Sequence, residues 1–145
     1  MTFSLRAMQA DDYPALLSLW QQSDGLVLRD SDSPTAIAAY LARNPGLSFV
    51  ALAQGQLIGC LLVGTDGRRG YLQHLVVQES HRGQGVARAL LQAATQALQA
   101  IGIDKSHLLV LANNEPALAF YRHLGWTQRT DVQLFSYTSS GNPHS

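Results

Sequence analysis

The segment from Arg82 to Ala87 has the composition of an anion-binding loop. Gly83 and Gly85 lie directly before a long amphipathic stretch, and residues without side chains let the main chain turn sharply and approach a ligand closely. The first amides of a helix have no partners within the helix and lie at the positive end of its dipole, so they favour phosphate. Arg82 and Arg88 add positive charge. The sequence therefore predicts a phosphate or pyrophosphate site.

Two other phosphate-binding motifs do not fit this segment. A dinucleotide fingerprint would need a small residue at position 88, which is arginine, and it would follow a strand of a parallel unit instead of a hairpin meander. A P-loop would end in Gly-Lys-Ser or Gly-Lys-Thr, and the sequence has neither. Coenzyme A, which carries a pyrophosphate and an adenosine phosphate, remains as the ligand that the loop favours.

The inner stretch of the strand before this loop carries one candidate for acid–base chemistry, His74. Residues 68–78 contain no carboxylate. An imidazole with a pKa of about 6.5 can accept a proton from an incoming ammonium group near neutral pH. Strand alternation places His74 on the same face as Leu72 and Val76, which is also typical of a structural histidine in a core. Both interpretations stay open at this point.

The apolar periodicities predict an α/β fold of the α+β type, with a mixed sheet and helices on both of its faces. After a first strand come two helical stretches, of which the second begins at the cap Ser33 and Pro34. Three apolar runs joined by glycine-containing turns then predict an antiparallel meander, and Gly85 to Ile101 has the clearest helical spacing. The predicted strands are residues 3–7, 48–53, 56–64, 71–77, 107–111 and 132–137, and another helix is expected after Asn114.

Two motifs in the second half of the chain match a known pair of signatures. Arg82-x-x-Gly85-x-Ala87 matches Gln/Arg-x-x-Gly-x-Gly/Ala, and Asn114 to Trp126 matches an Asn-x-x-Ala-x-x-aromatic-Tyr helix that ends in Leu-Gly-aromatic. The chain thus resembles the GNAT superfamily of N-acetyltransferases, and most of all its small bacterial YpeA and ribosomal-protein-alanine acetyltransferase groups. The resemblance implies one domain at residues 1–137, a polar tail at 138–145, and a mixed sheet of about six to seven strands with a splayed parallel pair.

The resemblance also implies acetyl-CoA as cosubstrate. In the family, the pantetheine arm pairs with the strand before the first signature, which here is Leu75, Val76 and Val77, and an amide of that strand polarises the thioester carbonyl. Asn114 would bond the same arm, and it is equally suited to be a plain helix cap. The residues expected around the pyrophosphate are Arg82, Gly83, Gln84, Gly85, Val86, Ala87 and Arg88.

The expected reaction is direct attack of a primary amine, on a small molecule or a protein N-terminus, within a ternary complex. Tyr121 corresponds to the family tyrosine that protonates the departing thiolate, with a core aromatic as the alternative. The glutamate base of many members has no counterpart on the strand, which leaves His74 as the candidate base.

A catalytically silent CoA-binding regulatory module is the other function we consider. The loop between the first two helices would recognise the acceptor, or merely be solvated, through Asp24, Arg29, Asp30 and Asp32.

Composition argues against several other classes of protein. Ten basic and ten acidic side chains balance, and no Lys or Arg run marks a nucleic-acid surface. The apolar stretches fall short of the roughly 20 residues that span a bilayer, so we expect a cytoplasmic protein. Cys60 is the only cysteine, which excludes an intrachain disulfide, and its apolar neighbours favour a buried thiol. We expect no bound metal, because the histidines lack the spacing of metal ligands. The edge of the last predicted strand would allow a homodimer.

Overall fold

The computed structural model describes residues 2–145, which divide into two compact units, one up to Leu108 and one from Leu109. The second unit contains one helix, α4 (Glu115–His123). A single domain over residues 1–137 therefore stays a prediction. The main elements of the first unit are β1 (Ser4–Ala7), α1 (Tyr13–Gln21), α2 (Pro34–Arg43), β2 (Phe49–Ala53), β3 (Gln56–Thr65), β4 (Gly70–Val77), α3 (Val86–Ala100) and β5 (Ser106–Leu108).

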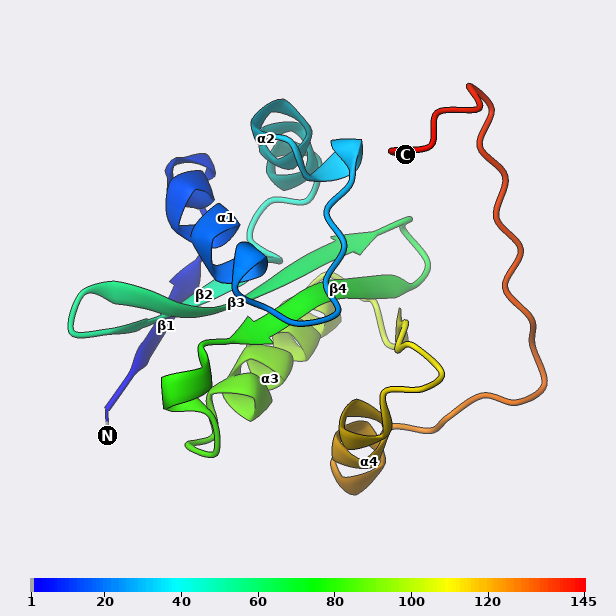
Figure 1. The fold of residues 1–145 in the computed structure, drawn as a ribbon. Helices are drawn as coiled ribbons and strands as arrows, with labels where there is room; N and C mark the ends of the chain where they lie inside the picture. The colour runs from blue at the N-terminus through cyan, green and yellow to red at the C-terminus, as the bar shows by residue number, and fades with distance from the viewer. Residues whose placement is uncertain (1) are drawn as a thin grey trace. The chain divides into compact units, whose positions relative to one another are not determined.

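The first unit is built on a mixed five-stranded sheet in the order β1-β2-β3-β4-β5 (Figure 1). The neighbours from β1 to β4 are antiparallel, whereas β4 and β5 are parallel. The parallel pairing covers only Gly70 to Leu72 opposite Ser106 to Leu108. From Gln73 onward, β4 therefore extends beyond its pairing with β5, as expected for a splayed pair.

Helices cover both faces of this sheet, with α1 and α2 on one side and α3 on the other (Figure 1). On the first side, Leu16 and Trp20 are completely buried and belong to one apolar cluster with strand residues such as Cys60 and Val76. The long helix α3 turns a regular apolar stripe inward because its apolar residues recur at helical spacing. The buried residues of that stripe are Val86, Leu90, Leu91, Ala94 and Leu98.

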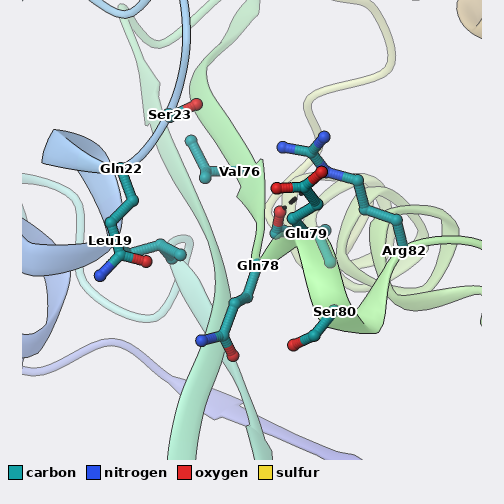
Figure 2. Close-up of a pocket in the computed structure, with 9 residues that line it drawn as sticks. Leu19, Gln22, Ser23, Val76, Gln78, Glu79, Ser80 and Arg82 are labelled. Atoms are coloured by element: carbon teal, nitrogen blue, oxygen red, sulfur yellow. Dashed lines mark hydrogen bonds between the residues drawn. The ribbon is translucent and has the colours of Figure 1, made fainter.

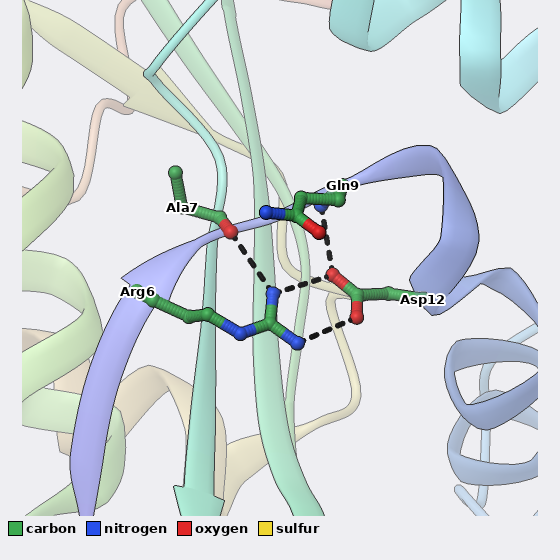
Figure 3. A network of polar contacts seen from close by, with 4 residues as sticks. All are labelled: Arg6, Ala7, Gln9 and Asp12. Carbon is green, nitrogen blue, oxygen red and sulfur yellow. Dashed lines mark hydrogen bonds and ion pairs between the residues drawn. The ribbon is translucent and has the colours of Figure 1, made fainter.

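An ion pair fixes the start of α1 against β1 (Figure 3). The Nη1 and Nη2 groups of Arg6 donate to the two carboxylate oxygens of Asp12 at 2.9 and 2.7 Å. The backbone amide of Gln9 donates to the same carboxylate at 2.7 Å. The hydrogen bonds from Arg6 are the main reason why the pKa of Asp12 lies below its ordinary value. This contact orients α1, whose C-terminal end borders the site described below.

A β-bulge interrupts the pairing of β3 with β4. Leu62 is opposite Gln73 and Cys60 is opposite Val76, so one residue of β3 faces two residues of β4, His74 and Leu75. His74 has a φ of +52°, in the left-handed region that few residues other than glycine adopt. Sequence alternation does not reveal such a bulge, because it adds a residue without changing the apolar character of the strand.

The bulge changes which side chains face which helix. Gly70 lies against α3, so Leu72, two residues further along the strand, faces α3 as well. His74 instead contacts Trp20 of α1, with ring centroids 5.3 Å apart, and Val76 lies in the apolar cluster around Trp20. The prediction that Leu72, His74 and Val76 share a face is therefore wrong for Leu72, because the bulge shifts the alternation by one residue.

The second unit has less regular structure than the sequence predicts. The strand predicted at residues 107–111 is observed only as Ser106–Leu108, and no strand forms at residues 132–137, so the described sheet has five strands instead of six or seven. Strands need a partner for their backbone groups, and among residues 2–145 none pairs with this segment. Its apolar side chains are accordingly exposed, with Phe135 at 91% and Tyr137 at 90%.

Candidate functional site

The loop between β4 and α3 has the backbone geometry of an anion site. Gly83 and Gly85 have φ angles of +77° and +86°, and beyond the adjoining backbone no atom lies within 4 Å of the place where a Cβ would stand on either residue. Gly85 is the N-cap of α3, and no side chain caps the helix. The first turn of α3 also holds no acidic residue. The helix therefore presents uncapped first-turn amides to open space, where a phosphate group can accept their hydrogen bonds.

Two arginines flank these amides. The Nε group of Arg82 donates to the carbonyl of Val77 at 3.2 Å, which fixes the arginine stem to the end of β4. Arg88 is exposed in the first turn of α3. Both positions add positive charge to the end of the helix where the dipole is positive, as the sequence predicts.

A cavity of about 450 Å³ adjoins this loop (Figure 2). Its wall combines the end of α1, the end of β4 and the start of the loop, so apolar and polar side chains both line it. The volume falls within the usual range of small-molecule sites, roughly 300 to 1,000 Å³. Of the strand residues predicted to contact the cosubstrate, Val76 and Val77 line it and Leu75 does not. The complete wall is Leu19, Gln22, Ser23, Val76, Val77, Gln78, Glu79, Ser80 and Arg82.

His74 is held by the carboxylate of a loop residue, Asp32, which the sequence indicates only as a candidate contact of the acceptor. Its Nε2 atom lies 2.7 Å from Oδ1 of Asp32, a residue 42 positions earlier in the chain. Its side chain is 16% exposed, and its ring meets the edge of Trp20. Trp20 adjoins Leu19 of the cavity wall, and Val76 lies two residues after His74. His74 itself does not line the cavity, and its contact with Trp20 places the imidazole on the α1 side of the sheet.

Asp32 differs from the other acidic residues of its loop because it is 8% exposed. Its Oδ2 atom accepts a hydrogen bond from the backbone amide of Arg29 at 2.9 Å, and its carbonyl accepts one from the hydroxyl of Tyr13 at 2.7 Å. The only sequence signal for this role is the three-residue spacing from Arg29, at which an aspartate can accept from a preceding amide and close a turn. The contact with His74 has no local signal.

The other loop residues predicted to recognise an acceptor lie on the surface. Asp24, Arg29 and Asp30 are exposed, and they are not part of the cavity wall. Gln22 and Ser23, directly before them, supply the polar groups of that wall on the α1 side. Recognition of an acceptor by Asp24, Arg29 or Asp30 stays a prediction.

The second unit holds Asn114 and Tyr121. Asn114 caps α4, since its Oδ1 atom accepts from the amide of Ala117 at 3.3 Å, so its interpretation as a helix cap is confirmed. Tyr121 meets the rings of Phe120 and Trp126 at centroid distances of 5.3 and 6.0 Å. Burial raises the pKa of Tyr121 to about 12, so its phenol keeps its proton throughout the physiological range. The cosubstrate contact of Asn114 and the acid role of Tyr121 stay predictions.

Cys60 does not have the properties of a nucleophile. It is fully buried, and burial raises the pKa of its thiol to about 12, where thiolate is scarce at neutral pH. Its Sγ atom donates to the carbonyl of His74 at 3.4 Å, a contact that supports the bulge. Residues 2–145 contain no group of three or more His, Cys, Asp or Glu side chains arranged to hold a metal ion.

The whole site-bearing region matches a known family. A family model described as the Acetyltransferase (GNAT) family matches residues 5–126. The chain belongs to this family. A relative from Pectobacterium atrosepticum, named an acetyltransferase, is 34% identical over 121 residues, which cover 83% of this chain and 84% of that protein. The chain is accordingly an acetyl-CoA-dependent acetyltransferase.

Solved structures support the same fold. The PaiA N-acetyltransferase of Thermoplasma acidophilum, in complex with coenzyme A, superposes with a TM-score of 0.77 at 19% identity, over 86% of this chain and 89% of that one. The ribosomal-protein-S18-alanine N-acetyltransferase of Escherichia coli gives 0.76 at 22% identity, over 97% and 87% of the two chains. The GNAT fold is thereby confirmed. Within residues 2–145, no helix has the length and apolarity needed to cross a bilayer.

Proposed function

We propose that this GNAT enzyme transfers the acetyl group of acetyl-CoA to a primary amine, on a small molecule or a protein N-terminus, by direct attack within a ternary complex. The observation that carries the proposal is the continuity of one site. The uncapped amides of α3, the cavity next to Arg82 and the end of β4 adjoin one another within the first unit. A diphosphate ester and an acceptor can therefore be bound side by side.

Acetyl-CoA fits these features in the following way. The pyrophosphate accepts hydrogen bonds from the loop of Gly83 to Ala87, with Arg82 and Arg88 supplying charge. The pantetheine arm runs along β4 from Leu75 to Val77, where the strand has passed the end of its pairing with β5. Asn114 is the expected further contact of the arm. The coenzyme A complex of the PaiA relative supports this cosubstrate for the present chain.

Each proton transfer of the proposed reaction can be assigned to a residue or to solvent. His74 accepts a proton from the ammonium form of the acceptor, directly or through water, and the free amine attacks the thioester carbonyl carbon. An amide of the stretch from Leu75 to Val77 donates to the developing oxyanion. As the carbon–nitrogen bond forms and the carbon–sulfur bond breaks, the departing sulfur takes a proton from Tyr121, and the nitrogen releases its second proton to solvent. The imidazolium of His74 then gives its proton, through water, to the phenolate of Tyr121, so both residues return to their starting forms and one proton is released overall.

The raised pKa of Tyr121 limits how this last step can occur. A phenol with a pKa of about 12 is a weaker acid than a thiol with a pKa of about 8.5. Transfer of the proton from Tyr121 to the thiolate is therefore uphill, so the phenol must be in direct hydrogen-bonding contact with the sulfur when it donates the proton. Its contribution then depends on position more than on acidity.

The acceptor side of the site is polar without being strongly charged. Gln22, Ser23 and Glu79 contribute to the cavity wall, and Glu79 is the carboxylate among them that can attract an ammonium group. Asp24, Arg29 and Asp30 follow on the exposed loop and are the proposed contacts of larger acceptors. This arrangement favours a primary amine over an anionic acceptor.

The proposal is tested by titrating acetyl-CoA into the protein calorimetrically and then measuring thiol release with a panel of amino acids, polyamines, aminoglycosides and N-terminal peptides. Binding followed by amine-dependent thiol release is the expected result. Binding without release for any amine would favour a CoA-binding regulatory module. Failure to bind acetyl-CoA would contradict the proposed site altogether.

A further inference from the structure

The contact between His74 and Asp32 decides which ring nitrogen carries the proton. An ionised carboxylate only accepts hydrogen bonds, so the Nε2 atom, 2.7 Å from Oδ1 of Asp32, must be the donor. In the neutral imidazole the other nitrogen, Nδ1, is then unprotonated and can accept a proton. A histidine without such a partner exchanges between its two tautomers and only part of the population has this form.

We propose that Asp32 is a positioning residue for acetyl transfer: it holds His74 in the Nε2–H tautomer, so that Nδ1 receives the proton of the acceptor amine. The carboxylate also stabilises the imidazolium that results, because it lies at hydrogen-bonding distance in a buried setting. This inference rests on the proposed function and extends it to a residue that would not contact the substrate.

The surroundings of the pair support a dedicated role. The left-handed backbone of His74 is unfavourable for a residue with a side chain, and such conformations persist where neighbouring contacts hold them in place. Here the bulge turns the ring towards α1, where Trp20 meets its edge and Asp32 meets its Nε2 atom. An extra residue in the strand thus brings the imidazole to the carboxylate.

The contacts that three neighbouring residues make with His74 and Asp32 do not involve the bond between the two side chains. The Tyr13 hydroxyl of α1 donates to the backbone carbonyl of Asp32, not to its carboxylate. The Cys60 thiol of β3 donates to the backbone carbonyl of His74, and its pKa of about 12 keeps it neutral. Arg29 meets the carboxylate through its backbone amide. Among these contacts, the carboxylate of Asp32 is the charged group at hydrogen-bonding distance from the imidazole.

Replacing Asp32 by asparagine should reverse the tautomer without removing the contacts. The carboxylate has two acceptor oxygens, one for the amide of Arg29 and one for His74. Asparagine has one oxygen, and if the Arg29 amide keeps it, the amide nitrogen faces Nε2 of His74 as a donor. Nε2 must then accept, the ring proton moves to Nδ1, and the nitrogen available to the amine is no longer basic.

The first experiment reads the tautomer directly by long-range nitrogen–proton NMR of the His74 ring in the substrate-free protein at pH 8. We expect the Nε2–H form in the wild type and the Nδ1–H form in Asp32→Asn. Asp104→Asn, which changes an exposed aspartate of the same unit, is the matched control and should leave the ring signals unchanged. A wild type in the Nδ1–H form, or an unchanged ring in Asp32→Asn, would overturn the inference.

The second experiment compares acetyl transfer over pH. We expect Asp32→Asn to lower kcat by about 100-fold at pH 7, the lower end of what general base catalysis contributes, with the Kd for acetyl-CoA changed less than about threefold. The difference in kcat between Asp32→Asn and the wild type should become smaller as the pH approaches the pKa of the acceptor amine, because an amine that is already unprotonated needs no base. A loss that is constant over pH would indicate a structural role and overturn the inference. A wild type that acetylates no amine would instead contradict the proposed function.

Discussion

Placing a negative charge at Gly85 tests whether the β4–α3 loop holds the pyrophosphate. We compare Gly85→Asp with Gly85→Asn, which has the same shape without the charge. Both side chains point into open space, since beyond the adjoining backbone no atom lies within 4 Å of a Cβ at this position. Both residues also tolerate the left-handed φ of +86° better than other residues do. The difference between the two variants therefore isolates charge.

The expected magnitude follows from Coulomb's law. Two unit charges about 4 Å apart interact by about 1 kcal/mol in water and about 4 kcal/mol near a protein surface. Gly85 is exposed, so a value of about 1.5 kcal/mol for each of the two pyrophosphate charges is appropriate. The sum of about 3 kcal/mol corresponds to a Kd for acetyl-CoA that is roughly 100-fold weaker in Gly85→Asp than in Gly85→Asn.

Stability should change in the opposite direction. An acidic residue at the start of a helix is favourable by about 0.3 to 1 kcal/mol, so Gly85→Asp should unfold at a denaturant concentration no lower than Gly85→Asn. Calorimetric titration at low salt measures the two Kd values. Added salt should bring these Kd values closer together, because it screens the charge of the aspartate. If Gly85→Asp binds acetyl-CoA within threefold of Gly85→Asn at low salt, the loop is not the pyrophosphate site.

Three further predictions concern single side chains. Tyr121→Phe should lower kcat about 100-fold without changing the Kd for acetyl-CoA, and equal kcat values in a thiol-release assay would refute the acid role. Because the pKa of Tyr121 is about 12, the pH profile of the wild-type enzyme should show no tyrosine ionisation between pH 6 and 10. Cys60, with a thiol pKa of about 12, should react with Ellman's reagent at pH 8 about a thousandfold more slowly in the folded than in the unfolded protein, and rapid labelling would reopen a covalent mechanism. Asp12→Asn should cost about 1 kcal/mol in the free energy of unfolding at pH 7, a small value because Arg6 is partly exposed. Since the folded pKa of Asp12 is lowered, its stabilisation is fully present above the unfolded pKa of about 4 and is lost as pH falls through the folded value. The difference in the free energy of unfolding between wild type and variant, measured by urea titration, should therefore decrease progressively as the pH is lowered below about 4.

Features set by local periodicity could be predicted from the sequence. The helix expected from Gly85 to Ile101 is observed as Val86–Ala100, because its apolar residues repeat at the helical period and Gly85 provides the turn before it. The caps Ser33 and Asn114 accept the backbone hydrogen bonds that their residue types indicate. For the helix and the caps, the residues that predict the structure and the backbone that adopts it lie in the same short segment.

Features that depend on distant contacts could not be predicted in this way. Asp32 reads as one of several loop acids, and its burial against His74 follows from how α1, α2 and β4 come together. Residues 132–137 have the alternation of a strand, yet alternation supplies no partner for the backbone, and Phe135 and Tyr137 are exposed. Polarity patterns describe how a segment would be buried, whereas pairing depends on which other segment is available.

The bulge of β4 makes His74 an insertion in the structural sense. Without this one residue, Leu75 would stand opposite Leu61, and the pairs on either side, Gln73 with Leu62 and Val76 with Cys60, would keep their partners and their faces. One codon could therefore be gained or lost here without shifting the remainder of the sheet. A lineage can acquire or discard the imidazole in a single step, and deletion of His74 would yield a regular hairpin instead of a misfolded one.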